Sequence, residues 1–163
     1  GTFNLLRTLP ISIERIIFSK ILSQIFLLAI ILVPTIIFIY SIGTLSSPAF
    51  NIDLGIIFSA YLSLLLLIIV FVCLSALASS MANKQALSFV LGVFLNFVFW
   101  QGPQEMSKIF NFDFTFQSLN YHFQNISRGV LDFSSVGFYL GLILMIMGLI
   151  ILRFRWNYLK SKI

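Results

Sequence analysis

The sequence is 163 residues long, with 60% hydrophobic and 9% charged residues and a formal net charge of +5. A mean hydropathy of +1.06 over this length gives more apolar surface than one soluble core can bury, so an integral membrane protein is expected in place of a soluble domain. The single cysteine, Cys73, excludes an intrachain disulfide framework and a thiolate metal site. The basic residues are scattered through short segments, which does not fit a nucleic-acid partner.

The opening stretch, residues 1–20, has the pattern of an amphipathic helix followed by a break. Its apolar residues recur at spacings of three to four, which places them on one helix face. They are Phe3, Leu6, Leu9 and Ile13. Pro10 interrupts the helix, while Ser12 and Glu14 suit the first turn of a new one. The sequence therefore predicts a short surface helix, an elbow, and a second helix that enters the membrane.

Four uncharged, apolar runs follow, and each predicts a transmembrane helix. They cover residues 21–42, 54–78, 85–102 and 136–152. The third run is short unless its polar ends are included. Within the first, Pro34 predicts a kink, and the hydroxyl of Thr35 is placed to satisfy a freed carbonyl. The expected fold is all-α, a polytopic transmembrane helix bundle of four spans that forms a single domain over residues 1–163.

Charge distribution predicts the orientation of this bundle. The segments before the first span, between the second and third, and after the fourth contain most of the basic residues, whereas the other side has only Lys108 and Arg128. The residues of the basic side are Arg7, Arg15, Lys20, Lys84, Arg153, Arg155, Lys160 and Lys162. By the positive-inside rule, both ends of this chain are cytoplasmic and the protein is multi-pass in the plasma (inner) membrane.

The segment from residue 103 to 135 is then expected to be an external loop. Phenylalanines alternate with polar residues over 110–116, which fits either a strand-like edge or aromatic anchors at the membrane interface, and we favour the anchors. Apolar residues at helical spacing behind Ser118 predict a short external amphipathic helix over 119–130. His122 is the only histidine and is expected at the surface of this loop.

The spans contain no ionisable side chain of the kind that drives ion-coupled transport. Motifs for nucleotide binding, zinc proteolysis and serine hydrolysis are also absent from the sequence, so the chain is not expected to be an enzyme or to hold a metal. Polar residues deep enough to line a pathway are Gln24, Ser59, Ser63 and Asn96. Hydrogen bonding between helices is the alternative role for them.

Three glycines of the last span share one face, which permits close helix approach either within the chain or in a dimer. They are Gly137, Gly141 and Gly148.

Three segments resemble type-2 ABC transporter permeases. The opening GTFNLLRTLPIS is similar to that family's G-T-x-x-L-L-x-T-x-P-x-S signature. SSMANKQALSF resembles the turn between its fourth and fifth spans, and SLNYHFQNISRGVLDF resembles the external segment before its last span, particularly in the gliding-motility-associated branch. Because the family has six spans, the resemblance implies that two spans and an N-terminal part are missing from this sequence.

The resemblance also implies a mechanism and partners. The opening segment would be a cytoplasmic coupling helix that contacts a separate ABC ATPase subunit, and two permease halves, identical or different, would form an exporter in the lipid bilayer. ATP and Mg would bind the ATPase, with no cofactor in this chain. The implied interface residues are Thr2, Phe3, Leu5, Leu6, Arg7, Thr8, Leu9 and Pro10.

Two alternatives stay open. The opening segment could rest on the lipid surface, with Arg7 meeting headgroups. The chain could also be a non-transporting scaffold that anchors a multiprotein machine of the cell envelope.

Overall fold

The computed structural model describes residues 13–47, 52–82, 84–110, 113–129 and 132–160, and every regular element in these residues is helical. The longer helices are α2 (Ile13–Leu32), α4 (Leu54–Met81), α5 (Gln85–Phe110) and α7 (Phe133–Lys160). The shorter elements are the 3-10 turns η1 (Val33–Thr35) and η2 (Thr115–Gln117) and the helices α3 (Ile36–Leu45) and α6 (Leu119–Ser127). The expected all-α fold is confirmed.

Four helical segments are long and apolar enough to cross a membrane, as the sequence predicts. They are Glu14–Leu45, Leu54–Met81, Gln85–Phe110 and Phe133–Trp156. All four extend beyond the apolar runs at one or both ends, because a run of apolar residues marks the part of a helix that suits hydrocarbon and not the polar turns that continue it into water. By length and composition, these four helices are candidate spans of a multi-pass membrane protein.

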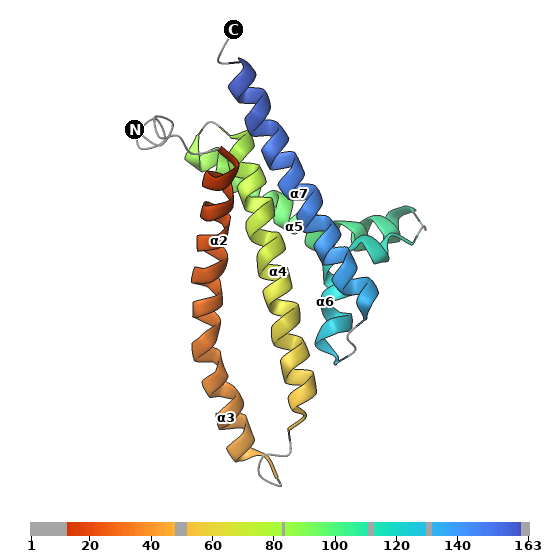
Figure 1. Cartoon of the computed structure of the whole chain (residues 1–163). Coiled ribbons are helices and arrows are strands. Elements are labelled where there is room, and N and C mark those ends of the chain that lie inside the picture. The colour runs from red at the N-terminus through yellow and green to blue at the C-terminus, as the bar shows by residue number, and fades with distance from the viewer. Residues whose placement is uncertain (1–12, 48–51, 83, 111–112, 130–131, 161–163) are drawn as a thin grey trace.

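α4 is the central helix of the bundle, and α2, α5, α6 and α7 all pack against it (Figure 1). Asp53 caps its start, with its side chain accepting hydrogen bonds from two backbone N–H groups of the first turn. The buried core lies around the second half of α4, where Val70 and Leu74 are fully covered and Cys73 is 1% exposed. Cys73 is therefore a packing residue.

The first span is broken at the predicted position. α2 ends at Leu32, η1 contains Pro34, and α3 continues the span. The Thr35 hydroxyl lies 2.6 Å from the Leu32 carbonyl, to which it donates, and 2.7 Å from the Tyr61 hydroxyl on α4. The predicted kink and the predicted hydroxyl-to-carbonyl bond are both confirmed, and the break is fixed to the neighbouring helix.

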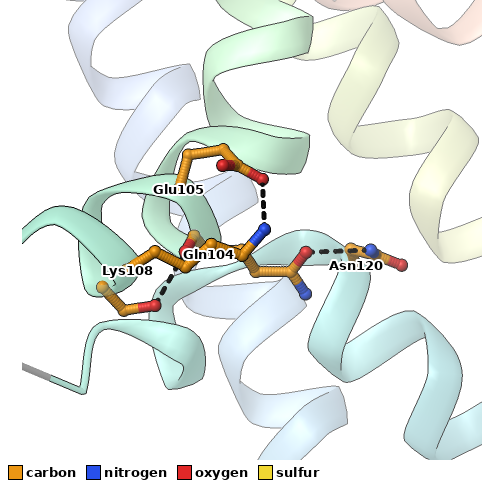
Figure 2. Close-up of polar contacts among 5 residues, drawn as sticks. Gln104, Glu105, Lys108 and Asn120 are labelled. Carbon is orange, nitrogen blue, oxygen red and sulfur yellow. Dashed lines mark hydrogen bonds and ion pairs between the residues drawn. The ribbon is translucent and has the colours of Figure 1, made fainter. Parts of the chain in front are cut away.

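The start of the predicted external loop is helical, which corrects the expectation for residues 103–135. α5 continues through Pro103, and its last turns are stabilised by the ion pair between Glu105 and Lys108 at 2.8 Å. Figure 2 shows Gln104 on α5 and Asn120 on α6 turned toward one another, with a hydrogen bond of 3.2 Å between their side-chain amides. Polar pairing of this kind lets the helix continue after the apolar run ends.

The described helices place three segments at the same end of the bundle: the start of α2, the α4–α5 turn and the end of α7 (Figure 1). The end of α3 and the start of α4 lie at the opposite end (Figure 1). The three segments at the same end contain basic residues that the charge distribution of the sequence predicts on one side of the membrane. Among them are Lys20, Lys84 and Arg155. We call this the basic end.

Candidate functional site

His122 is the centre of a buried polar network between α6 and α7. The side chain is 3% exposed, its Nε2 lies 2.8 Å from the Phe116 carbonyl oxygen, and its Nδ1 lies 2.9 Å from Ser135 Oγ. Because a carbonyl oxygen only accepts, Nε2 carries a proton, and in the neutral ring Nδ1 accepts from the Ser135 hydroxyl. These two partners therefore select one tautomer of the neutral imidazole. The expectation that His122 is a surface residue is wrong.

Three further hydrogen bonds fix α6 and its flanking residues to the three long helices around them. In each of them, the hydroxyl of a buried side chain donates to a main-chain carbonyl oxygen, so that both polar groups have a hydrogen-bond partner. The bonds run from Ser63 Oγ to Phe123 O at 3.1 Å, from Tyr139 Oη to Leu119 O at 3.2 Å, and from Ser118 Oγ to Trp100 O at 3.1 Å. The predicted amphipathic helix is thus packed into the bundle through one face and does not simply lie on its surface.

A pH dependence follows from the His122 environment. Burial lowers the pKa of the His122 imidazole below its ordinary value, against the opposing effects of the Phe116 carbonyl and the Asp132 charge. In the unfolded chain the imidazole titrates near pH 6.5, so between that value and the lowered pKa the unfolded state binds more protons. We expect stability to be full above about pH 6.5 and to be lost as the pH falls through the lowered pKa.

Thermal unfolding in detergent at about pH 7.5 and about pH 5.5 measures this effect. The wild-type midpoint should fall further on acidification than that of His122→Gln, which has no titrating group at this position. Equal falls for the two proteins would mean that another group causes the pH dependence.

A second polar site lies at the basic end, where α2, α4 and α7 line a partly open cavity of about 130 Å³. Its inner wall is apolar and includes the buried residues Ile17, Ile21 and Ile150. Its polar lining residues are Lys20, Gln24, Ser75, Ser79 and Ser80. Because the surrounding helices are otherwise apolar, this is the place where the described part of the bundle offers a charged group and hydroxyls to the same small volume.

Of the four predicted pathway residues, one lines this cavity and a second is hydrogen-bonded to a residue that lines it. Gln24 lines it directly. Asn96 on α5 donates from Nδ2 to Ser75 Oγ at 3.0 Å and to the Gly92 carbonyl at 2.8 Å, so it contacts the cavity wall from behind. Among the described residues, the Asn96 Oδ1 atom is buried without a hydrogen-bond partner. A buried oxygen without a hydrogen-bond partner destabilises the folded protein, so a structural role alone does not explain Asn96, and this residue stays a candidate for the pathway.

The other two predicted pathway residues, Ser59 and Ser63, lie elsewhere on α4. From Ser63 to Ser75 is about 18 Å along a helix. Ser59 donates to the Ile56 carbonyl at 2.9 Å and Ser63 donates to α6, and both side chains are at most 2% exposed. The hydrogen-bonding alternative accounts for these two serines, and the structure does not join the four residues into one path.

The three glycines of α7 lie on an exposed face. A Cβ atom built at Gly137, Gly141 or Gly148 meets nothing within 4 Å. None of them brings another described helix close to α7. Contact across a dimer therefore stays a prediction for these positions.

Sequence reasoning missed Lys20, Ser75 and Ser79 as residues of one site. Ser75 and Ser79 are four residues apart, and therefore one turn apart on the same helix face. That spacing is a signal that the sequence contains. The contribution of Lys20 from another helix is not readable from it, because it depends on how α2 packs on α4.

The predicted coupling residues, from Thr2 to Pro10, lie outside the described residues. Within the described part of the chain, no three His, Cys, Asp or Glu side chains are grouped so as to hold a metal ion. Comparison with protein-family models, with curated proteins and with solved structures gives no match for this chain.

Proposed function

We propose that this chain is the membrane-spanning permease subunit of an ATP-driven exporter of the type-2 ABC kind, moved by a separate ATPase subunit. The observation that carries the proposal is the way in which the first span, α2 with α3, is attached to the bundle. It runs beside α4 (Figure 1), and most of its large apolar side chains remain exposed within this chain. A span with so little internal packing is suited to movement relative to its neighbours.

The contacts of this span with the other helices follow one face of α2, including the half-buried Ile25 and Leu28, and recur at the break of the span. Near its start, Ile17 and Ile21 are buried, and Glu14 pairs with Arg155 of α7 at 2.5 Å. At its break, Thr35 is hydrogen-bonded to Tyr61 of α4. The span is therefore held along one face of α2 and again at η1.

These attachments suit a lever. α2 has 20 residues, which gives a stiff rod of about 30 Å between the basic end and the break. A force applied to the residues before α2 passes into this rod through the continuous chain. Movement of the rod about the Thr35–Tyr61 contact, with the 3-10 turn absorbing the change in direction, would tilt the span as alternating access requires.

The proposal includes two protein partners, an ATPase subunit and a second permease half. The charge bias favours a cytoplasmic basic end in the inner membrane, where an ATPase subunit holding ATP and Mg would contact residues 1–10. A second permease half, the same chain or a different one, would cover part of the exposed apolar faces and lipid the rest. A role in gliding motility rests on the resemblance of residues 117–133 alone.

Co-purification tests the proposal directly. The complete protein is purified in mild detergent from its own membranes, with Leu6→Asp and Arg7→Glu as variants and Arg128→Glu as a control with the same charge reversal. We expect an ATP-binding subunit to accompany the unaltered protein and the control, and to be reduced about tenfold or more by either variant, because each places a carboxylate in the proposed apolar and basic interface.

The same experiment separates the transporter from the alternative. If the unaltered protein brings down no ATP-binding subunit, the non-transporting scaffold becomes the better proposal. Equal losses in the variants and in Arg128→Glu would argue against residues 1–10 as the coupling surface.

A further inference from the structure

The cavity at the basic end has the composition of a small-ligand site. Apolar walls with a few placed polar groups are typical of such sites. Here the walls come from buried isoleucines of α2 and α7, and the polar groups come from Lys20 and Gln24 of α2 and from serines of α4. The question is which ligand these groups would recognise.

Lys20 sets the sign of the ligand charge. All five acidic residues of the sequence lie in the described part of the chain: Glu14, Asp53, Glu105, Asp113 and Asp132. None of them pairs with Lys20, because Glu14 pairs with Arg155, Glu105 pairs with Lys108, and the remaining three form no ion pair among the described residues. Lys20 is exposed and lines the cavity without a carboxylate partner among the described residues, so its ammonium group is available to pair with an anion from outside the chain.

The other polar groups favour an anion with several oxygens. Ser75 Oγ accepts from Asn96, which leaves its own hydroxyl hydrogen for an acceptor. Gln24 and Ser79 add further donors on facing helices, whereas the Ser80 hydroxyl already donates to the Leu77 carbonyl at 2.6 Å. One cation and three neutral donors around a small volume match the oxygens of a phosphate group.

The position of the cavity along the helices indicates the source of that phosphate. Lys20 is the last charged residue before the uncharged run of the first span, and Ser79 lies in the last turn of α4. The cavity is therefore at the boundary between apolar helix and water, where lipid headgroups lie. Beside it, Phe18 and Leu22 of α2 are 56% and 53% exposed and offer an apolar surface to acyl chains.

We propose that the cavity between α2, α4 and α7 binds the phosphate of an anionic phospholipid headgroup. Lys20 forms the ion pair, and Gln24, Ser75 and Ser79 donate hydrogen bonds to the phosphate oxygens. The lipid would join the lightly packed first span to α4 and α7 at the basic end. This site does not depend on the permease function and would exist equally in a scaffold.

Native mass spectrometry of the complete purified protein tests the site with defined lipids. Phosphatidylglycerol is the anionic probe, phosphatidylcholine the zwitterionic one, and inorganic phosphate the free anion. We expect preferential retention of phosphatidylglycerol and a reduction of about tenfold in Lys20→Gln, the loss expected for one charge-assisted contact. Ser79→Ala should lower retention about threefold.

Lys84→Gln is the matched control, because Lys84 is exposed at the same end but does not line the cavity. Its retention of phosphatidylglycerol should change less than about twofold, as expected for an exposed charge. Equal loss in Lys84→Gln and Lys20→Gln would overturn the proposal in favour of general surface attraction. Equal retention of the two lipids, or displacement of phosphatidylglycerol by inorganic phosphate at equal concentration, would also overturn it. Lys20 is exposed and Ser79 small, so the unfolding midpoints of both variants should match wild type.

Discussion

Replacement of His122 by alanine is expected to lower the free energy of unfolding by about 3 kcal/mol. The substitution removes both hydrogen bonds of the imidazole and leaves the Phe116 carbonyl and the fully buried Ser135 hydroxyl without these partners. It also removes a ring stacked on Phe138, whose centroid lies 4.1 Å away, and leaves a cavity in its place. Because His122 joins α6 to α7, α6 should open before the rest of the bundle.

Reversible unfolding in mixed micelles measures the total loss, and hydrogen exchange of the α6 amides locates it. Gln124→Ala is the control on the same helix, since Gln124 is exposed and bonds only to Asn120 among side chains. It should cost less than about 0.5 kcal/mol. Similar losses for the two variants, or exchange that rises evenly along the chain, would show that His122 does not hold α6 in particular.

Gly92→Leu is expected to lower the free energy of unfolding by about 2 kcal/mol by separating α4 from α5. Gly92 is buried, and a Cβ atom added there would lie 3.9 Å from the Ala78 Cβ and 3.9 Å from Ser75 Cα. One methyl group fits at this distance, but a leucine side chain adds three more carbons in the direction of α4. Asn96, one turn further along α5, would lose its bond to Ser75 as the helices move apart.

Gly148→Leu is the matched control for this prediction, because it adds the same side chain to a helix where a Cβ meets nothing within 4 Å. Unfolding in micelles should therefore leave Gly148→Leu within about 0.5 kcal/mol of wild type and Gly92→Ala close to it as well. If Gly148→Leu destabilised the monomer as much as Gly92→Leu, the α4–α5 contact would not be the cause. A lower dimer fraction in Gly148→Leu, with unchanged monomer stability, would instead support the dimer role of the α7 glycines.

The helical class and the number of spans were predictable from the sequence, because long uncharged apolar runs have few other stable forms in a bilayer. The break at Pro34 was predictable for a similar reason, since proline in the interior of a helix removes a backbone hydrogen bond and crowds the preceding turn, although α5 accommodates Pro103. The extension of α5 past Pro103 was not. The polar turns after Pro103 are stabilised by the hydrogen bond between Gln104 and Asn120 and by the ion pair between Glu105 and Lys108. These contacts form only once the turns are helical, so the sequence pattern does not show them.

The polar sites were less predictable than the spans. Ser63, Gln24 and Asn96 were recognised as polar groups within apolar runs, but their separate roles depend on which neighbour each helix presents. The interpretation of His122 failed because a histidine in a polar segment is most often exposed, and its burial needs both Ser135 and the Phe116 carbonyl. Hydrogen-bond partners from distant segments of the chain cannot be recognised from the local sequence pattern around either residue.

The attachment of α6 through main-chain carbonyls has a consequence for how this segment can diverge. Ser63 and Tyr139 hold the carbonyls of Phe123 and Leu119, and every amino acid supplies a carbonyl. Exposed positions such as Gln124 and Arg128 can therefore change their side chains freely while the helix keeps these two bonds. The exposed face of α6 can therefore acquire new recognition chemistry by substitution, while its buried face, which includes His122, keeps the framework beneath it unchanged.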